Sequence, residues 1–326
     1  MKKVLGIGNA LVDVMVPLDD DSVINKLGFA KGSMTLVDTR KSREIKDMIA
    51  DRVESMASGG SAANTIHGLG KLRAQTGFIG AVGEDTTGNI FRDNMKSAGV
   101  NTYLSTKDDD SGTAVAMVSS DSERTFATHL GAAEKLTADD LDRSVFREYD
   151  YLYLEGYLIT NMKLVETACK YAKAEGLKIA IDLASFNVVE AFKKDFEHII
   201  DNYIDIIFAN EQEARVFTGM EPEKAAKELS KKCDIAVVKT GADGSLIHDG
   251  NTITPVEAMK VKSIDTTGAG DLFAAGFLYG LVNNADMATC GAIGTVLAGN
   301  VIEVMGPKID TDKWNRIRKD VNENII

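Results

Sequence analysis

Cysteines, long apolar runs and positive charge are all scarce in this chain of 326 residues. The three cysteines lie far apart without Cys-x-x-Cys spacing, which argues against a disulfide framework or a zinc site. No apolar run approaches the roughly 20 residues that a membrane-spanning helix needs. Acidic residues outnumber basic ones by 49 to 37, which argues against a nucleic-acid partner. We therefore expect a cytoplasmic protein without membrane or nucleic-acid partners, either a monomer or a homodimer.

Several familiar nucleotide-binding motifs are also missing. The chain has no Gly-x-x-x-x-Gly-Lys-Ser/Thr sequence, which disfavours a P-loop kinase. It lacks the His-Arg-Asp and Asp-Phe-Gly signatures of protein kinases. Gly6 and Gly8 follow a strand-like run, as in dinucleotide-binding dehydrogenases, but Leu11 stands where the third glycine would be. A two-glycine match is weak evidence, so a dehydrogenase is disfavoured as well.

Short apolar runs that alternate with amphipathic, helix-like stretches dominate the chain. Runs of four to six residues without clear alternation suit strands that are buried on both faces. This rhythm predicts a single α/β domain over residues 1–326, with a mainly parallel sheet and ligands beyond the carboxyl ends of its strands. The predicted strands are Val4–Ile7, Thr76–Ile79, Tyr151–Leu154, Ile179–Asp182, Ile204–Ala209 and Ile235–Thr240.

Two regions depart from this rhythm. Gly112–Ser119 and Arg124–Leu130 resemble a hairpin around the turn Ser120–Glu123. Val12–Val16 and Ser33–Val37 also have strand character and are separated by a short acidic helix candidate. We expect residues 12–16, 33–37 and 112–130 to form a small sheet that projects from the main one as a lid.

The most informative stretch is the glycine-rich segment Asp265–Asp271, which precedes the apolar helix predicted over Leu272–Val282. Gly268 and Gly270 allow backbone N–H groups to approach an anion closely, and a helix N-terminus adds positive potential at the same place. Asp271 could accept a proton from a hydroxyl nucleophile beside this anion hole. The alternative is that Asp271 is an ordinary helix cap after a flexible loop.

Three motifs resemble the PfkB, or ribokinase-like, family of carbohydrate and nucleoside kinases. Residues 265–278, DTTGAGDLFAAGFL, are similar to its C-terminal signature, residues 59–65, GGSAANT, to its earlier one, and Asn210-Glu-Gln-Glu213 to its Asn-x-x-Glu motif. The motifs occur in the family's order, and the resemblance spans roughly residues 4 to 306. It implies a three-layer α/β/α sandwich with a small β-sheet lid, ATP as co-substrate and Mg²⁺ as cofactor.

The resemblance also implies roles on the phosphate side of the site. Asp271 would be the catalytic base, and the turn formed by Thr267, Gly268, Ala269 and Gly270 would cradle the transferring phosphoryl group. Asn210 and Glu213 would organise Mg²⁺ largely through water, although the same pair could simply form a capping box. Lys239, Thr240, Gly241 and Gly244 would surround the nucleotide. Arg124 would reach towards the phosphates of the nucleotide, or else it is only a solvated charge. Asp265 and Thr267 would form part of a possible K⁺ site.

On the acceptor side, Asp13 resembles the family carboxylate that takes two adjacent ribose hydroxyls, as an acceptor-only group can; otherwise it is a solvated strand end. Asn9, Gly59, Gly60 and Asn64 would complete this polar cradle. Met34, Leu36, Tyr157 and Phe186 are candidates for an apolar slot for a base, or else ordinary core residues.

The segments Gly8–Asp13, Arg124–Ala133 and Gly156–Leu158 look more like bacterial adenosine kinases than like ribokinases. We therefore expect the acceptor to be adenosine or a related ribonucleoside. A sugar kinase of the ribokinase or fructokinase type, or a catalytically silent nucleoside sensor, is the alternative.

Overall fold

The computed structural model describes residues 2–120, 123–304, 306 and 308–324. Within these residues, nine strands form a central sheet in the order β14-β13-β12-β11-β10-β9-β1-β5-β6. Neighbouring strands from β6 to β12 are parallel, and only β13 runs in the opposite direction, antiparallel to both β12 and β14. The mainly parallel sheet is thus confirmed. Its strands are β1 (Val4–Ile7), β5 (Thr76–Gly83), β6 (Val100–Lys107), β9 (Tyr151–Glu155), β10 (Lys178–Asp182), β11 (Ile206–Asn210), β12 (Ile235–Lys239), β13 (Ser245–His248) and β14 (Ile253–Val256).

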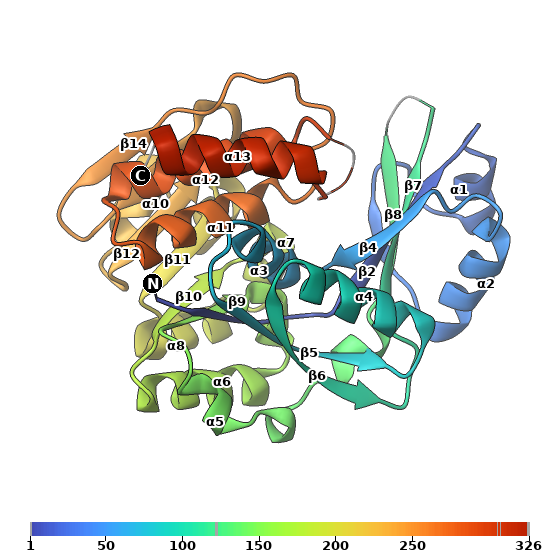
Figure 1. Ribbon diagram of the computed structural model, residues 1–326, viewed down its shortest axis with the longest axis horizontal. Coiled ribbons are helices and arrows are strands. Elements are labelled where there is room, and N and C mark those ends of the chain that lie inside the picture. The colour runs from blue at the N-terminus through green and yellow to red at the C-terminus, as the bar shows by residue number, and fades with distance from the viewer. Residues whose placement is uncertain (1, 121–122, 305, 307, 325–326) are drawn as a thin grey trace.

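Alternate residues of these strands pack into two separate hydrophobic clusters, because successive side chains of a strand point to opposite faces. Val4 faces one layer of helices, whereas Leu5 and Ile7 face the other. The chain therefore has three layers (Figure 1). The first helical layer holds α3 (Ser61–Lys71), α4 (Thr86–Ser97), α11 (Ala269–Val282) and α12 (Met287–Val301), with α13 (Thr311–Asn324) packed on α12. The second holds α5 (Arg143–Phe146), α6 (Met162–Ala174), α7 (Phe186–Ala191), α8 (Lys193–Tyr203), α9 (Glu211–Thr218) and α10 (Pro222–Leu229).

A second sheet projects from the side of this sandwich, with α1 (Ser22–Leu27) and α2 (Thr39–Ile49) on the side away from the main body (Figure 1). Its five described strands have the order β3-β8-β7-β2-β4. They are β2 (Leu11–Pro17), β3 (Met34–Leu36), β4 (Ser55–Gly59), β7 (Gly112–Val118) and β8 (Arg124–His129). The segments 12–16, 33–37 and 112–130 therefore share one small sheet. The expected turn Ser120–Glu123 lies partly outside the described residues, and β4 was not predicted.

Short 3₁₀ helices connect several of these elements, at Gly131–Lys135, Ala138–Asp140, Gly156–Thr160 and Gly241–Asp243. Two of them follow the carboxyl ends of β9 and β12, where the ligand cavity opens.

Among the described residues, no helix combines the length and the apolar character that crossing a membrane requires.

Candidate active site

A cleft of about 1840 Å³ lies between the carboxyl ends of the central strands and the inner face of the small sheet. Pockets for a single small ligand commonly measure about 300–1,000 Å³, so this cleft has room for two substrates. Both sheets contribute to its lining. The predicted site residues among the lining are Asn9, Asp13, Met34, Leu36, Gly60, Asn64, Tyr157, Asn210, Glu213, Lys239, Gly241, Gly244, Thr267, Gly268, Ala269, Gly270 and Asp271.

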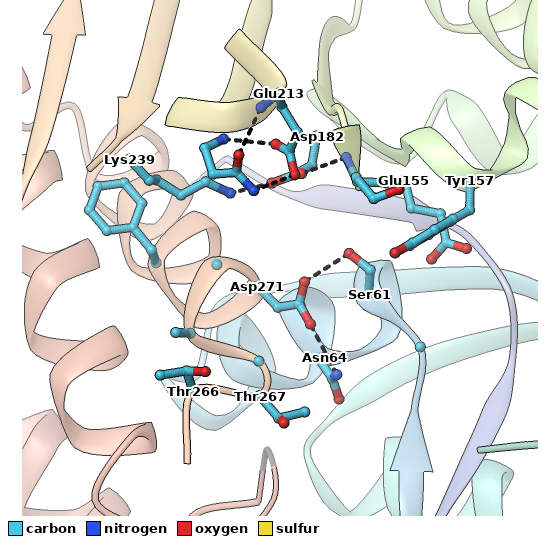
Figure 2. A pocket seen from close by; sticks show the side chains of 18 of the residues that line it. Ser61, Asn64, Glu155, Tyr157, Asp182, Glu213, Lys239, Thr266, Thr267 and Asp271 are labelled. Carbon is cyan, nitrogen blue, oxygen red and sulfur yellow. Dashed lines mark hydrogen bonds and ion pairs between the residues drawn. The ribbon is translucent and has the colours of Figure 1, made fainter. Parts of the chain in front are cut away.

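Asp271 lies at the centre of the cleft, on the first turn of α11 (Figure 2). The helix begins at Ala269, earlier than the predicted Leu272, because Gly268 at φ 77° supplies the left-handed turn that starts it. Asp271 is therefore not the capping residue. Its Oδ1 accepts a hydrogen bond from Ser61 Oγ at 2.8 Å, and its Oδ2 accepts one from Asn64 Nδ2 at 3.1 Å. Burial raises the pKa of Asp271 to about 6, against the lowering effect of these two bonds.

The turn before α11 is held in place by Asp265, which is almost fully buried. Asp265 Oδ1 accepts hydrogen bonds from Thr267 N and Oγ1, and Oδ2 accepts one from Gly306 N at 2.7 Å. Arg124 Nη1, from β8 of the small sheet, lies 2.5 Å from Asp265 Oδ2, and both side chains are buried. Arg124 is thus no solvated hairpin charge. It joins the small sheet to the turn that would cradle phosphate.

A second polar cluster lies at the carboxyl ends of β10, β11 and β12. Lys239 Nζ donates to Asp182 Oδ2 at 2.7 Å and lies against the first turn of α11, since a Cβ at Gly270 would be 3.1 Å from it. Burial and the neighbouring Asp182 carboxylate raise the pKa of Glu213 to about 7. Figure 2 shows Asp182, Glu213 and Lys239 facing Asp271 across the cleft. A positive group beside a helix N-terminus is suited to binding a phosphate.

Asn210 and Glu213 form a capping box at the start of α9. Asn210 N and Nδ2 donate to the two carboxylate oxygens of Glu213 at 2.7 and 2.6 Å, and Glu213 N donates to Asn210 Oδ1. Among the described residues, no group of three or more acidic, histidine or cysteine side chains could hold a metal ion directly. Glu213 lines the cleft, and its carboxylate is a group that can contact a hydrated Mg²⁺ through water.

Glu155, at the end of β9, is a functional candidate that the sequence reasoning missed. Its Oε1 accepts hydrogen bonds from Asn9 N and Nδ2, and its Oε2 accepts one from Ala62 N in the first turn of α3. Burial raises the pKa of Glu155 to about 7. By joining the turn after β1 to the start of α3, Glu155 fixes the two backbone segments that carry Asn9 and Asn64. No local motif marks such a long-range contact.

Asp13, on β2, lines the cleft and is half-buried, and within the described part of the chain its carboxylate makes no hydrogen bond or ion pair. Burial raises its pKa to about 6. The carboxylate packs over Gly59, where a Cβ would lie 2.2 Å from Asp13 Oδ1. Gly60 has φ 95°, and a Cβ there would lie 2.2 Å from the Asn9 carbonyl oxygen. The double glycine therefore makes room both for Asp13 and for a tight start to α3.

Some predicted residues lie outside the lining of the cleft. Phe186 is 41% exposed but does not line it, whereas Val188 and Phe192 from the same region do. Thr240, Gly59, Arg124 and Asp265 are not part of the lining either. Met34 and Leu36 face the cleft and are 54% and 62% exposed, so they are not core residues.

Comparisons with known proteins agree on one family. The model described as "pfkB family carbohydrate kinase" matches residues 32–314. The structure of a probable sugar kinase from Rhizobium etli CFN 42 superimposes with a TM-score of 0.89 at 29% identity, covering 100% of this chain and 99% of that one. That of adenosine kinase from Sinorhizobium meliloti gives 0.87 at 31% identity, covering 98% and 99%. An uncharacterized sugar kinase from Archaeoglobus fulgidus is 30% identical over 243 residues, which cover 74% of this chain and 96% of the relative.

Proposed function

The chain belongs to the pfkB family of carbohydrate kinases, and within this family we propose that it transfers the γ-phosphoryl group of ATP to the 5′-hydroxyl of adenosine or a related ribonucleoside. The observation that carries the proposal is the position of Asp271. Its carboxylate lies between the glycine-rich turn at the start of α11 and the side chains of α3 that face the acceptor cleft. A hydroxyl held there would meet a base on one side and a phosphoryl-binding turn on the other. Such an activity would serve purine salvage in the cytoplasm.

The transfer needs a base, an electrophile and charge stabilisation. Asp271 takes the proton as the acceptor oxygen forms its bond to phosphorus, and the bond to the leaving ADP oxygen breaks. With a pKa of about 6, the Asp271 carboxylate is mostly ionised at neutral pH but retains useful basicity. Backbone N–H groups of residues 268–270 and the Lys239 ammonium face the charge that moves to the leaving oxygens.

Mg²⁺ would neutralise phosphate charge when it is bound with ATP. Glu213 and Asn210 would hold it through water, since their side-chain oxygens already accept hydrogen bonds from each other's N–H groups. Arg124 and Asp265 form an ion pair with each other. The contact of Arg124 with phosphate and the contact of Asp265 with K⁺ therefore stay predictions.

Two observations support a nucleoside acceptor. The half-buried Asp13 carboxylate lines the cleft with free acceptor capacity, which suits a pair of ribose hydroxyls. Met34 and Leu36 present unusually exposed apolar side chains to the same cleft, and a flat base would cover them. A free sugar would need the polar cradle but would leave these two side chains in water.

The sugar-kinase names of two relatives keep a sugar acceptor as the second candidate. A catalytically silent sensor would bind the same ligands but would not need an oriented base. The two hydrogen bonds that orient Asp271 therefore favour an enzyme.

The proposal is tested by competition. Adenosine, inosine, ribose and fructose are mixed at equal concentration with ATP and Mg²⁺, and the product phosphates are measured. We expect adenosine 5′-monophosphate to dominate. Preferential phosphorylation of ribose or fructose would contradict the nucleoside assignment, and binding of adenosine without any product would indicate a sensor.

A further inference from the structure

Lys308, in the segment between α12 and α13, is a charged group near the acceptor cradle that has no role so far. Its Nζ donates to Ser58 Oγ on β4 at 3.1 Å and lies 3.4 Å from Asn64 Oδ1 on α3. Ser58 is completely buried, and Asn64 is nearly so. The ammonium group is therefore anchored on two elements that surround the acceptor, a strand of the small sheet and the helix that carries Asn64.

These contacts determine which way the Asn64 amide points. A lysine ammonium can only donate hydrogen bonds, and an ionised carboxylate can only accept them. Asn64 lies between the two, with its oxygen towards Lys308 and its NH₂ group towards Asp271 Oδ2. If the ammonium were lost, the Asn64 oxygen would lose this partner, and the bond to Asp271 would hold the amide with one contact fewer. The chain Lys308–Asn64–Asp271 thus links a distant cation to the orientation of the base.

The same ammonium lies near Asp13, because it contacts Ser58, and the next residue, Gly59, packs against the Asp13 carboxylate. Burial lowers the pKa of Lys308 to about 8, whereas the carboxylates of Asp13 and Asp271 raise it. The positive charge of Lys308 in turn opposes the burial that raises the pKa of Asp13 to about 6. Of the other groups facing Lys308, Lys71 on α3 lowers its pKa, and burial holds the pKa of His67, also on α3, well below 6.5. At neutral pH, His67 is therefore uncharged.

We propose that Lys308 is a positioning residue of the acceptor site, which orients the Asn64 amide towards Asp271 and holds Asp13 in the ionised form that accepts the acceptor's hydroxyls. The inference rests on the proposed function for the identity of the acceptor. The expected effect of Lys308 on the pKa of Asp13 needs no substrate, and this allows the two claims to be tested separately.

The kinetic test compares Lys308→Met, Lys308→Arg and the control Lys313→Met. Lys313, on α13, is similarly shielded and pairs with Glu303 at 2.9 Å, away from the cradle. We expect Lys308→Met to lower kcat/KM for the acceptor about 10- to 100-fold, the range found when a residue that orients a metal ligand is lost. The KM for ATP should change by less than about twofold, because the change is not on the nucleotide side. Lys308→Arg should restore much of the loss, and Lys313→Met should behave as wild type.

The pH profile supplies a signature that a purely structural role would not produce. In the wild type, kcat/KM for the acceptor should fall below pH about 6, where Asp13 and Asp271 take up protons, and above pH about 8, where Lys308 loses its own. Lys308→Met should move the acid limb to higher pH, because Asp13 loses a favourable charge, and should remove the alkaline limb. Lys308→Arg should keep the acid limb and shift the alkaline limb upward.

A ligand-free measurement separates this inference from the proposed function. Carbon NMR titration of the Asp13 carboxyl group, assigned with Asp13→Asn, should show a higher pKa in Lys308→Met than in wild type. An unchanged Asp13 pKa, or Lys308→Arg impaired as much as Lys308→Met, would overturn the inference. Failure of adenosine turnover would instead contradict the proposed function, and the kinetic comparison would then use the acceptor that wins the competition assay. If Lys308→Met does not fold, Lys308→Gln takes its place in each measurement.

Discussion

The two sheets of this protein differ in how they use their faces. The nine-stranded sheet is covered by helices on both sides, and the apolar residues of its central strands β1, β5, β9, β10 and β11 are buried. The five-stranded sheet is covered by α1 and α2 on one side only, and its other face borders the cleft. Met34 and Leu36 lie on this open face and are far more exposed than the side chains of the central strands.

This difference indicates a division of work within the site. The carboxyl edge of the large sheet and the start of α11 carry ionisable groups already oriented by hydrogen bonds, including Asp182, Lys239 and Asp271. The small sheet carries exposed apolar side chains and the unpaired carboxylate of Asp13. Under the proposed function, the large sheet performs the transfer and the small sheet selects the acceptor. Each of the following predictions should therefore affect one region and spare the other.

The largest effect is expected from Asp271→Asn on the transfer side. The amide cannot take the acceptor's proton, so kcat should fall roughly 10²- to 10⁴-fold while ATP binding and folding persist. Asp286→Asn is the matched control, since Asp286 starts α12 and accepts a hydrogen bond from Thr289 N at 2.7 Å far from the cleft. If both variants turned over at nearly the wild-type rate, Asp271 would have only a structural role at the start of α11.

A smaller effect is expected from Leu36→Ser on the selection side. The leucine side chain would lose apolar contact with the base, which should raise KM for adenosine about tenfold with little change in kcat. Met56→Ser is the control, because Met56 is an exposed residue of β4 that does not line the cleft. Equal changes in the two variants would show that the small sheet responds as a whole and has no specific base slot.

The smallest effect is expected from Glu213→Gln. A glutamine has a single acceptor oxygen for the two donors of Asn210 and no charge to hold hydrated Mg²⁺, so the Mg²⁺ concentration for half-maximal rate should rise about threefold. Glu211→Gln, next to it in the first turn of α9 but outside the lining of the cleft, is the control. If Glu213→Gln showed the same Mg²⁺ titration as wild type but a lower melting temperature, Glu213 would act only in the capping box of α9.

The sequence predicts the two regions unequally. The strand Val4–Ile7 is found as predicted, and the other five central strands are found within a few residues, because strands buried on both faces have continuous apolar runs. β5 extends to Gly83, beyond the predicted Ile79, because its glycine-containing end pairs with β6 although it lacks a strong apolar signal. β4 escapes prediction for a similar reason, since SMASG has little strand character and depends on antiparallel pairing with β2.

The same distinction holds within the site. Residues in local motifs, such as Asp271 and Asn210, could be predicted because backbone turns and helix starts depend on neighbours in sequence. Glu155 and Lys308 could not, because each acts on residues that lie more than 90 positions away. Phe186 was proposed because it is aromatic and follows a parallel strand, but these two features do not determine which way its side chain points, and it does not line the cleft.

Hydrogen exchange with each ligand alone tests the division of work most directly. Adenosine should slow exchange in β2, β3, β7 and β8, because its base and ribose would cover the open face of the small sheet. A non-hydrolysable ATP analogue should instead slow exchange at residues 239–244 and 266–271. Protection by adenosine that is confined to residues 239–244, with no change in the small sheet, would contradict the assignment of acceptor selection to that sheet.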